Sequence, residues 1–137
     1  MLHLVRALGF CIFVGFATFA LARTDPVAET KIQAVISQQL DALDKNDSSA
    51  AFAIASPKIQ TLFQTAEFFI DMVERGYPQL RHSRGHRFLK LDWVDGVLIA
   101  RVLVDSDSGS VIARYEMIEI DGVWRINGCS LEPRQDT

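Results

Sequence analysis

Two hydrophobic periods divide the chain near residue 85. Between residues 25 and 85 the apolar positions recur every three or four residues, which is typical of amphipathic helices. From residue 87 onward they alternate with polar positions or run continuously, which is typical of strands. Helices followed by strands, with no internal repeat or linker, predict one α+β domain with N-terminal helices packed on an antiparallel sheet.

The first predicted helix begins at Asp25-Pro26. Asp25 can accept a hydrogen bond from a free backbone N–H, and Pro26 lacks the N–H that would otherwise stay unpaired in the first turn. Asn46-Asp47 can end this helix. Its apolar stripe, at helical spacing, is formed by Ile32, Val35, Ile36, Leu40 and Leu43.

Shorter helical pieces follow this helix. A helix is predicted over residues 48–55, and Ser56-Pro57 caps and starts the next one. Thr65 can cap a further helix, which Gly76 can close. The following Tyr77-Pro78 predicts extended geometry, because a residue before proline avoids the helical region.

Four strands are predicted, over residues 88–94, 97–104, 111–120 and 123–131. Asp95-Gly96 joins the first two and Asp121-Gly122 joins the last two. Such pairs favour tight hairpins, because Gly tolerates a positive φ and Asp can form a hydrogen bond within its own turn. The sequence therefore predicts an antiparallel meander.

The N-terminus is typical of a secretory signal peptide. Arg6 precedes an uncharged run over residues 7–22, which ends in the A-x-A pattern Ala20-Leu21-Ala22. Cleavage is expected between Ala22 and Arg23, which leaves residues 23–137 as a single domain in the periplasm or outside the cell. The uncharged run is shorter than the roughly 20 residues that span a bilayer. An uncleaved membrane anchor is the alternative, and no other contact with the membrane is expected.

Composition excludes several classes of protein. The 137 residues are 49% hydrophobic and carry a net charge of -3, which is unlike a disordered chain and offers no basic surface for nucleic acid. Of the two cysteines, only Cys129 remains after the expected cleavage, so no intrachain disulfide can form. Cys129 is expected to be a small buried residue of the last strand. Intermolecular pairing and a catalytic thiolate are alternatives that nothing nearby in sequence supports.

Several short fragments resemble one bacterial family in their order and spacing. They lie within residues 30–131 and are Ile36-x-x-Gln39-Leu40-x-Ala42-Leu43-x-x-x-Asp47, Ala55-Ser56-Pro57-x-Ile59-Gln60-x-x-Phe63, Phe69-x-x-Met72-Val73-x-x-x-Tyr77 and Trp124-Arg125-Ile126-x-Gly128-Cys129. They are similar to the exported family called domain of unknown function 4864. The resemblance implies a nuclear-transport-factor-two-like fold of the SnoaL-like and cystatin-like superfamily, in which a strongly bent four-stranded sheet wraps helices into a cone. It implies no reaction, because proteins of this fold serve many functions.

A basic segment joins the predicted helices to the sheet. Arg81, Arg84 and Arg87 are candidates to bind an anion or an acidic partner, because guanidinium groups suit carboxylate and phosphate. A solvated connection is the simpler interpretation. His82 and His86 would share one helical face, but Gly85 indicates a loop, so no metal site is expected.

Acid–base catalysis has little support in the sequence. Asp41, Asp44 and Asp47 lie off the apolar stripe, so they are expected to be exposed and ionised. Asp71 and Asp92 could lie in the cone, but neither has a visible partner. No nucleophile elbow or phosphate-binding loop is present, and no cofactor is expected. A dehydratase or isomerase therefore remains only an alternative.

The interior of the cone is the preferred candidate site. Such concave apolar spaces are common ligand sites, although a filled core is the simpler interpretation. A binding module would need a cavity of roughly 300 Å³ or more. The large residues expected to line it are Phe63, Phe69, Met72, Tyr77, Tyr115 and Trp124.

An association module is the second hypothesis. Val97, Ile99 and Leu103 lie opposite the face formed by Leu98, Ala100 and Val102, so the second strand is apolar on both faces. One face must meet the helices, and the other could meet a second subunit in a homodimer.

Overall fold

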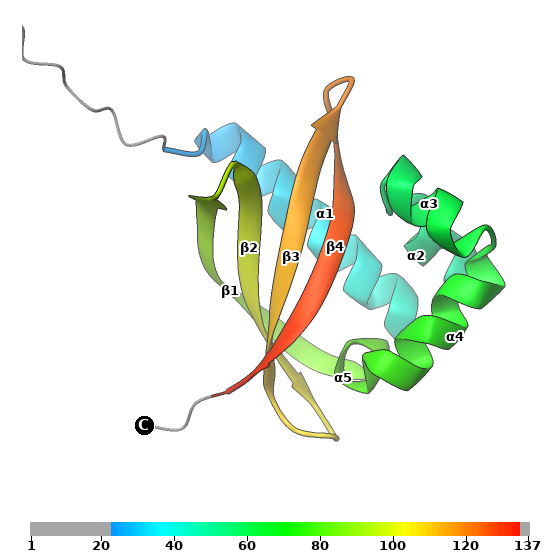
Figure 1. Ribbon diagram of the computed structural model, residues 1–137. Coiled ribbons are helices and arrows are strands. Elements are labelled where there is room, and N and C mark those ends of the chain that lie inside the picture. Colours follow the sequence, from blue (N-terminus) through cyan, green and yellow to red (C-terminus); the bar gives the residue numbers. More distant parts are fainter. Residues whose placement is uncertain (1–22, 135–137) are drawn as a thin grey trace, which may run out of the picture.

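The computed structural model describes residues 23–134 and confirms helices followed by a curled antiparallel sheet. The elements are α1 (Pro26–Asp44), α2 (Ser48–Ala53), α3 (Pro57–Phe63), α4 (Ala66–Gly76), α5 (Pro78–Arg81), β1 (Ser83–Val94), β2 (Val97–Ser106), β3 (Val111–Ile120) and β4 (Val123–Pro133). The strands lie in the order β1-β2-β3-β4. In Figure 1, α1 crosses one face of the sheet, and α2, α3 and α4 gather beyond the β4 edge.

The helices begin where the capping residues predict. Asp25 accepts a hydrogen bond of 3.0 Å from the Val27 N–H at the start of α1. Thr65 accepts one of 3.2 Å from the Phe68 N–H at the start of α4. Each side chain satisfies a backbone donor that the first helical turn leaves free.

The second helix is shorter than predicted, because the chain after it pairs with β4. Ala55 forms a parallel bridge with Ile126, and the Ser56 N–H donates to the Ile126 carbonyl at 2.8 Å. The Ile126 N–H in turn donates to the Ile54 carbonyl at 3.2 Å. These bonds replace helical ones, so α2 ends at Ala53 and the α2–α3 junction is fixed to the sheet.

The connection to the sheet also differs from the sequence prediction. Tyr77 has a φ of -137° and a ψ of 50°, so it is neither helical nor fully extended. Pro78 occupies the first turn of the short helix α5, where its missing N–H costs nothing. The segment predicted as a loop around His82 and His86 is largely strand, because β1 already begins at Ser83. This segment pairs with the C-terminal end of β2, where His86 lies opposite Val104.

Both predicted hairpin turns are confirmed. Asp95 and Gly96 have φ angles of 49° and 79°, and Asp121 and Gly122 have φ angles of 51° and 77°. Two consecutive positive φ angles match the right-handed twist of the flanking strands. The sheet is therefore a simple meander.

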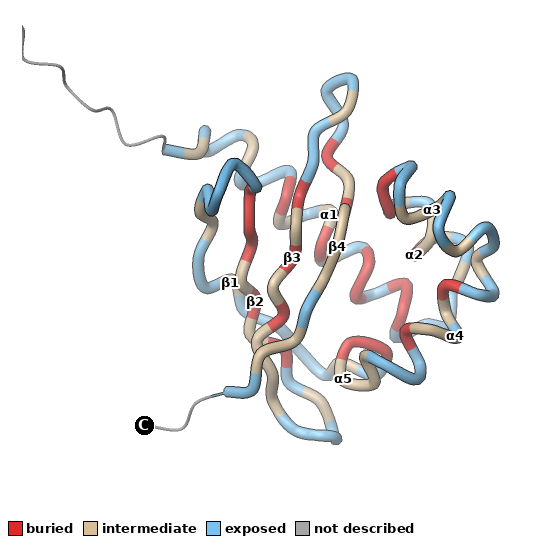
Figure 2. The backbone as a smooth tube through the Cα atoms, in the orientation of Figure 1, coloured by how far each residue is buried: buried red, intermediate tan, exposed pale blue. Residues whose placement is uncertain are grey.

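The core lies between α1 and the concave face of the sheet. Ala100, Tyr115 and Cys129 pair directly across β2, β3 and β4, so they form one row on that face. Figure 2 shows buried backbone on α1 and on the middle of β2 and β3. The buried residues that α1 contributes are Ile32, Ile36, Gln39, Leu40, Ala42 and Leu43.

A bulge in β4 shapes its approach to the helices. Glu116 lies opposite Gly128, but the next residue, Met117, lies opposite Ile126, so Asn127 is an extra residue in β4. A bulge of this kind bends its strand and increases the local twist. The Ser56 hydroxyl donates a hydrogen bond of 2.7 Å to the Asn127 side-chain oxygen at this point.

Candidate functional site

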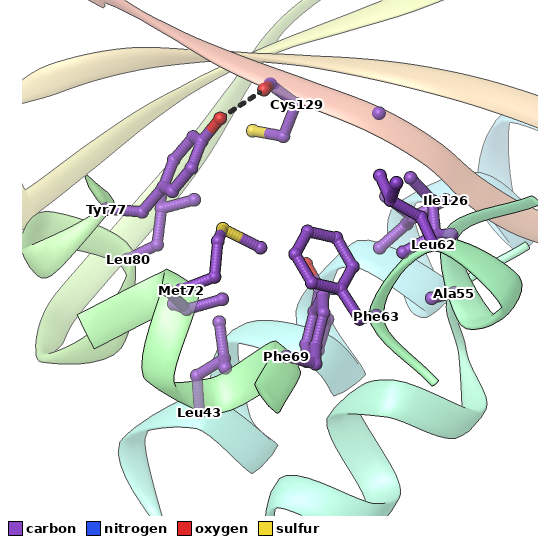
Figure 3. A pocket seen from close by; sticks show the side chains of 14 residues that line it. Leu43, Ala55, Leu62, Phe63, Phe69, Met72, Tyr77, Leu80, Ile126 and Cys129 are labelled. Carbon is purple, nitrogen blue, oxygen red and sulfur yellow. Dashed lines mark hydrogen bonds between the residues drawn. The ribbon is translucent and has the colours of Figure 1, made fainter. Parts of the chain in front are cut away.

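A pocket of about 240 Å³ lies between α3, α4 and β4. Its wall on the sheet is formed by the β4 segment around the bulge, and its base is formed by α1. Figure 3 shows the side chains of Phe63, Met72 and Tyr77 pointing into one common space. The lining residues are Gln39, Leu43, Ala55, Ile59, Leu62, Phe63, Phe69, Met72, Val73, Tyr77, Leu80, Ile126, Gly128 and Cys129.

An aromatic cluster forms the helical end of the pocket. The ring centroid of Phe69 lies 5.4 Å from that of Phe52 and 5.8 Å from that of Phe63. The second pair meets edge to face, which is a favourable arrangement for aromatic rings. Because Phe69 is buried on α4, the cluster holds Phe63 of the neighbouring α3 over the pocket.

Helix α3 covers the pocket and only borders the core, against which Ile59 and Phe63 pack. None of its seven residues, all of which the structure describes, is buried. Ser56, the residue before α3, is bound to Asn127, and Gln64, the residue after it, has a φ of 67°. Such a left-handed conformation is unusual for a residue other than glycine. The helix is thus fixed at its ends, and it places Ile59, Leu62 and Phe63 on the pocket.

The polar groups of the pocket are neutral. The Tyr77 hydroxyl donates a hydrogen bond of 2.9 Å to the Cys129 carbonyl, which Figure 3 shows as a dashed line. Burial raises the pKa of Tyr77, with a smaller contribution from Cys129. Burial, and then the charge of Glu116, raise the pKa of the Cys129 thiol to about 12. At neutral pH both groups keep their protons, so Cys129 does not present a thiolate.

Gln39 is the third polar group. It lies on α1, it is 5% exposed, and it lines the pocket. Among the described residues that line the pocket there is no Asp, Glu, His, Lys or Arg. Since a dehydratase or isomerase mechanism needs a positioned acid or base, this pocket gives it no support.

The structure brings together four of the six large residues named from the sequence. Phe63, Phe69, Met72 and Tyr77 all line the pocket. Tyr115 does not, because it points from the centre of β3 into the core and is 0% exposed.

Trp124 does not line this pocket either. It lies beside a separate open hollow near the start of α1, together with Trp93. Trp124 is the second residue of β4 and lies nearer the hairpin turn at Asp121-Gly122 than Ile126, Gly128 and Cys129, the β4 residues that line the pocket.

The basic segment does not form an anion site at Arg81. This residue is 8% exposed, and its guanidinium donates to the Leu43 carbonyl and to the Asn46 side-chain oxygen, the latter at 2.7 Å. Its Nε also lies 2.9 Å from Glu74. Arg81 therefore caps the end of α1, and the expectation that it binds an anion is wrong.

The other members of the basic segment are separate from one another. Arg84 forms an exposed ion pair of 3.0 Å with Asp107, and Arg87 is exposed on β1. The His82 ring lies 3.4 Å from Glu74, whereas His86 lies 2.9 Å from the Ser37 hydroxyl. Over residues 23–134, no three potential metal-ligating side chains of His, Cys, Asp or Glu come together.

The two acids considered for catalysis also lie elsewhere. Asp71 pairs with Arg75 on the exposed side of α4. Asp92 pairs with Lys90 along β1 at 3.0 Å. Neither carboxylate lines the pocket.

Sequence reasoning missed the roles of Gln39 and Cys129. Gln39 lies three residues after Ile36 and four before Leu43, so it falls on the buried stripe of α1, where a polar residue is a signal in itself. Cys129 is only half-buried and borders the pocket instead of lying in the core. No sequence signal marks this, because it depends on the β4 bulge.

The expected signal peptide and its cleavage site before Arg23 involve residues 1–22, which lie outside the described residues. Within the part of the chain that the structure does describe, no helix has the length and apolar character needed to cross a membrane.

The fold is similar to that of several solved structures. A protein of unknown function with a cystatin-like fold from Nostoc punctiforme aligns with a TM-score of 0.55 and 12% identity, over 80% of this chain and 92% of that one. An NTF2-like protein of unknown function from Shewanella baltica aligns with a TM-score of 0.50 and 22% identity, over 82% and 100%. Aln2 from a Streptomyces species aligns with a TM-score of 0.51 and 14% identity, over 80% and 93%. At these identities the likeness concerns the fold alone.

A comparison with curated proteins gave no match. A family model, in contrast, matches residues 26–137, which include all the helices and strands of the described domain. This chain therefore belongs to the family described as domain of unknown function (DUF4864), as its sequence fragments indicate.

Proposed function

We propose that this protein is a binding module that holds a small, neutral, mainly apolar molecule in the pocket between α3, α4 and β4. The observation that carries the proposal is a pocket of about 240 Å³ whose lining, among the described residues, contains no charged side chain. Concave apolar sites with a few polar groups are the usual form of small-molecule sites.

The volume limits the size of the molecule. An engineered protein cavity of about 150 Å³ is large enough to bind benzene, and sites for drug-sized ligands begin at about 300 Å³. The pocket lies between these values and is smaller than the sequence hypothesis required. A ligand of about ten non-hydrogen atoms, such as two fused rings, suits this space.

The polar groups limit its charge. Moving an ion out of water costs free energy that only an opposite charge or several hydrogen bonds can offset. Gln39, Tyr77 and Cys129 are the residues of the lining with polar side-chain atoms, and none of them carries charge at neutral pH. The pocket therefore favours neutral ligands over carboxylates, phosphates and amines.

Access to the pocket is through α3. Leu62 lines the pocket and is 67% exposed, so it lies at the boundary between the pocket and the solvent. A change in the rotamer of this exposed side chain can open the boundary while the ends of α3 stay in place. A ligand can enter this way while the core between α1 and the sheet stays intact.

Isothermal titration calorimetry with 2-naphthol tests the proposal. Ile59→Trp places a larger side chain in the pocket from α3, and it should abolish saturable binding. Thr61→Trp is the matched control, because Thr61 is an exposed residue of the same helix outside the lining. Saturable binding by wild type and Thr61→Trp, but not by Ile59→Trp, supports the proposal. Absence of binding to wild type, or equal binding to Ile59→Trp, overturns it.

A homodimer formed through the convex face of the sheet is the second candidate. Val97, Ile118 and Val123 are large apolar residues exposed on this face, and no helix of the described chain covers it. Ion pairs between Arg101 and Glu132 and between Arg114 and Glu116 lie further along the strands, away from the two hairpin turns. Sedimentation velocity at micromolar concentration tests this candidate, and a purely monomeric wild type rejects it.

A further inference from the structure

We infer that Gln39 selects the ligand through hydrogen bonds, and that the ligand carries a neutral acceptor beside a donor, as a lactam or a carboxamide does. The inference rests on the proposed function and assigns the chemical class of the molecule held in that pocket. It is carried by the burial of Gln39, by its place in the lining and by its lack of a partner among the described residues.

The side chain of Gln39 is buried but unpaired. It is 5% exposed and lines the pocket from α1. No hydrogen bond joins its amide to any other residue of the described chain, whereas Gln60, for example, donates to the carbonyls of Phe52 and Ala55. Its amide atoms keep some accessible surface, since they are not among the fully enclosed unpaired atoms of the described residues.

Stability of the fold does not explain this residue. Ile36 and Leu43 flank Gln39 on the same buried stripe, where an apolar side chain such as Leu would pack without losing a hydrogen bond. Buried polar groups are almost always hydrogen-bonded, because an unpaired one loses its bonds to water and gains none. A ligand that supplies the missing bonds accounts for the amide.

The chemistry of a carboxamide defines the matching group. The Gln39 side chain offers N–H donors beside a carbonyl acceptor in one plane. A lactam or carboxamide presents the complementary acceptor and donor in one plane, so two parallel hydrogen bonds can form. A ketone fills only the donor side, and a carboxylate brings a charge that no cation in the lining balances.

Tyr77 is a second group in the pocket that favours a ligand with a hydrogen-bond donor. Its proton is used in the hydrogen bond to the Cys129 carbonyl, so its oxygen can only accept a further bond. The Cys129 sulfur is a weak hydrogen-bonding group and adds little. A ligand N–H therefore has two acceptors in this pocket, the Gln39 carbonyl and the Tyr77 oxygen.

Three fragments of nearly equal size separate these preferences. Indane has no polar group, 1-indanone has an acceptor, and 2-oxindole has an acceptor beside an N–H donor. We would measure their dissociation constants by calorimetry for the wild type and for Gln39→Met, which keeps the length of the side chain and removes the amide. The loss of two hydrogen bonds should weaken 2-oxindole on the order of tenfold, 1-indanone by less, and indane not at all.

The outcomes distinguish this inference from the proposed function. If the wild type binds all three fragments and Gln39→Met weakens them equally, the pocket binds ligands but Gln39 does not select them. If the wild type binds none of them, both ideas fail together. Binding of indane by Gln39→Met shows that the variant is folded and that its pocket is intact.

A measurement on the wild type covers the case in which the variant does not fold. The side-chain NH₂ resonances of Gln39 should shift in an NMR titration with 2-oxindole and stay unchanged with indane at the same occupancy. Equal shifts with both fragments would contradict the inference.

Discussion

The Ser56 hydroxyl donates a hydrogen bond of 2.7 Å to the Asn127 side-chain oxygen, across 71 positions of the sequence. Ser56 is the first residue before α3, and Asn127 is the extra residue of the β4 bulge. The bond thus joins the helix that covers the pocket to the strand that forms its wall. The same Ser56 oxygen accepts the Ile59 N–H at 3.4 Å, so one side chain caps the helix and positions it.

Ser56→Ala should lower the free energy of unfolding by about 1–3 kcal/mol, because it removes the cap and leaves the Asn127 oxygen without its donor. Urea denaturation measures this loss. The double variant Ser56→Ala/Asn127→Ala should lose less than the sum of the two single variants, by about 0.5 kcal/mol or more. Strictly additive losses would show that the two side chains act independently.

Arg81→Met should lower the free energy of unfolding by about 2–4 kcal/mol, because the end of α1 loses a charged cap and Glu74 loses the nearer of its two partners. Arg84→Met is the control, since the exposed pair with Asp107 is worth less than about 1 kcal/mol. Urea denaturation compares the two variants. Similar losses in both would contradict the assignment of Arg81 as a structural residue.

Stability should fall as the pH rises above 9. In the unfolded chain the Cys129 thiol ionises near its ordinary pKa of 9.0, but burial raises the pKa of the folded thiol to about 12. Between these values the folded state holds a proton that the unfolded state has released, so the free energy of unfolding decreases with rising pH. The slope reaches about 1.4 kcal/mol per pH unit for one such group.

Cys129→Val separates this contribution from that of the tyrosines. Burial also raises the pKa of Tyr77 and, more strongly, that of Tyr115, so part of the slope should remain in the variant. Urea denaturation between pH 8 and pH 11 should give a smaller slope for Cys129→Val than for the wild type. Equal slopes would mean that the thiol is not protected by burial.

The N-terminal segment should be absent from the protein recovered from the cell envelope. Cleavage between Ala22 and Arg23 removes 22 of the 137 residues and leaves 115. The whole gene is expressed, the protein is recovered from the cell envelope, and intact-mass spectrometry shows whether its mass corresponds to residues 1–137 or to residues 23–137. A mass that retains residues 1–22 would favour the alternative of an uncleaved membrane anchor.

The parts of the fold that depend on local chemistry were predictable from the sequence. Asp25 and Thr65 cap their helices, and Asp95-Gly96 turns its hairpin, because neighbouring residues alone determine these conformations. The antiparallel meander follows from the same local order of strands and turns. Hence the α+β class and the strand order could be inferred without the structure.

The site could be predicted only in part, because long-range contacts shape it. Phe63 and Phe69 were placed correctly, since helical spacing shows which side is apolar. The position of Tyr115 was not predicted correctly. The alternation of apolar and polar residues assigns a residue to one face of the sheet, but it does not show how deep in the core the side chain lies. Arg81 was expected to be exposed because of its charge, and only the fold reveals that it meets the carbonyl end of α1.

The position of α3 at the border of the core has a consequence for how ligand preference can change. Substitutions at Ile59 and Leu62 alter the size and shape of the pocket, yet neither residue belongs to the buried core. The molecule that fits can therefore be exchanged through one short helix, while the packing of α1 against the sheet is left as it is.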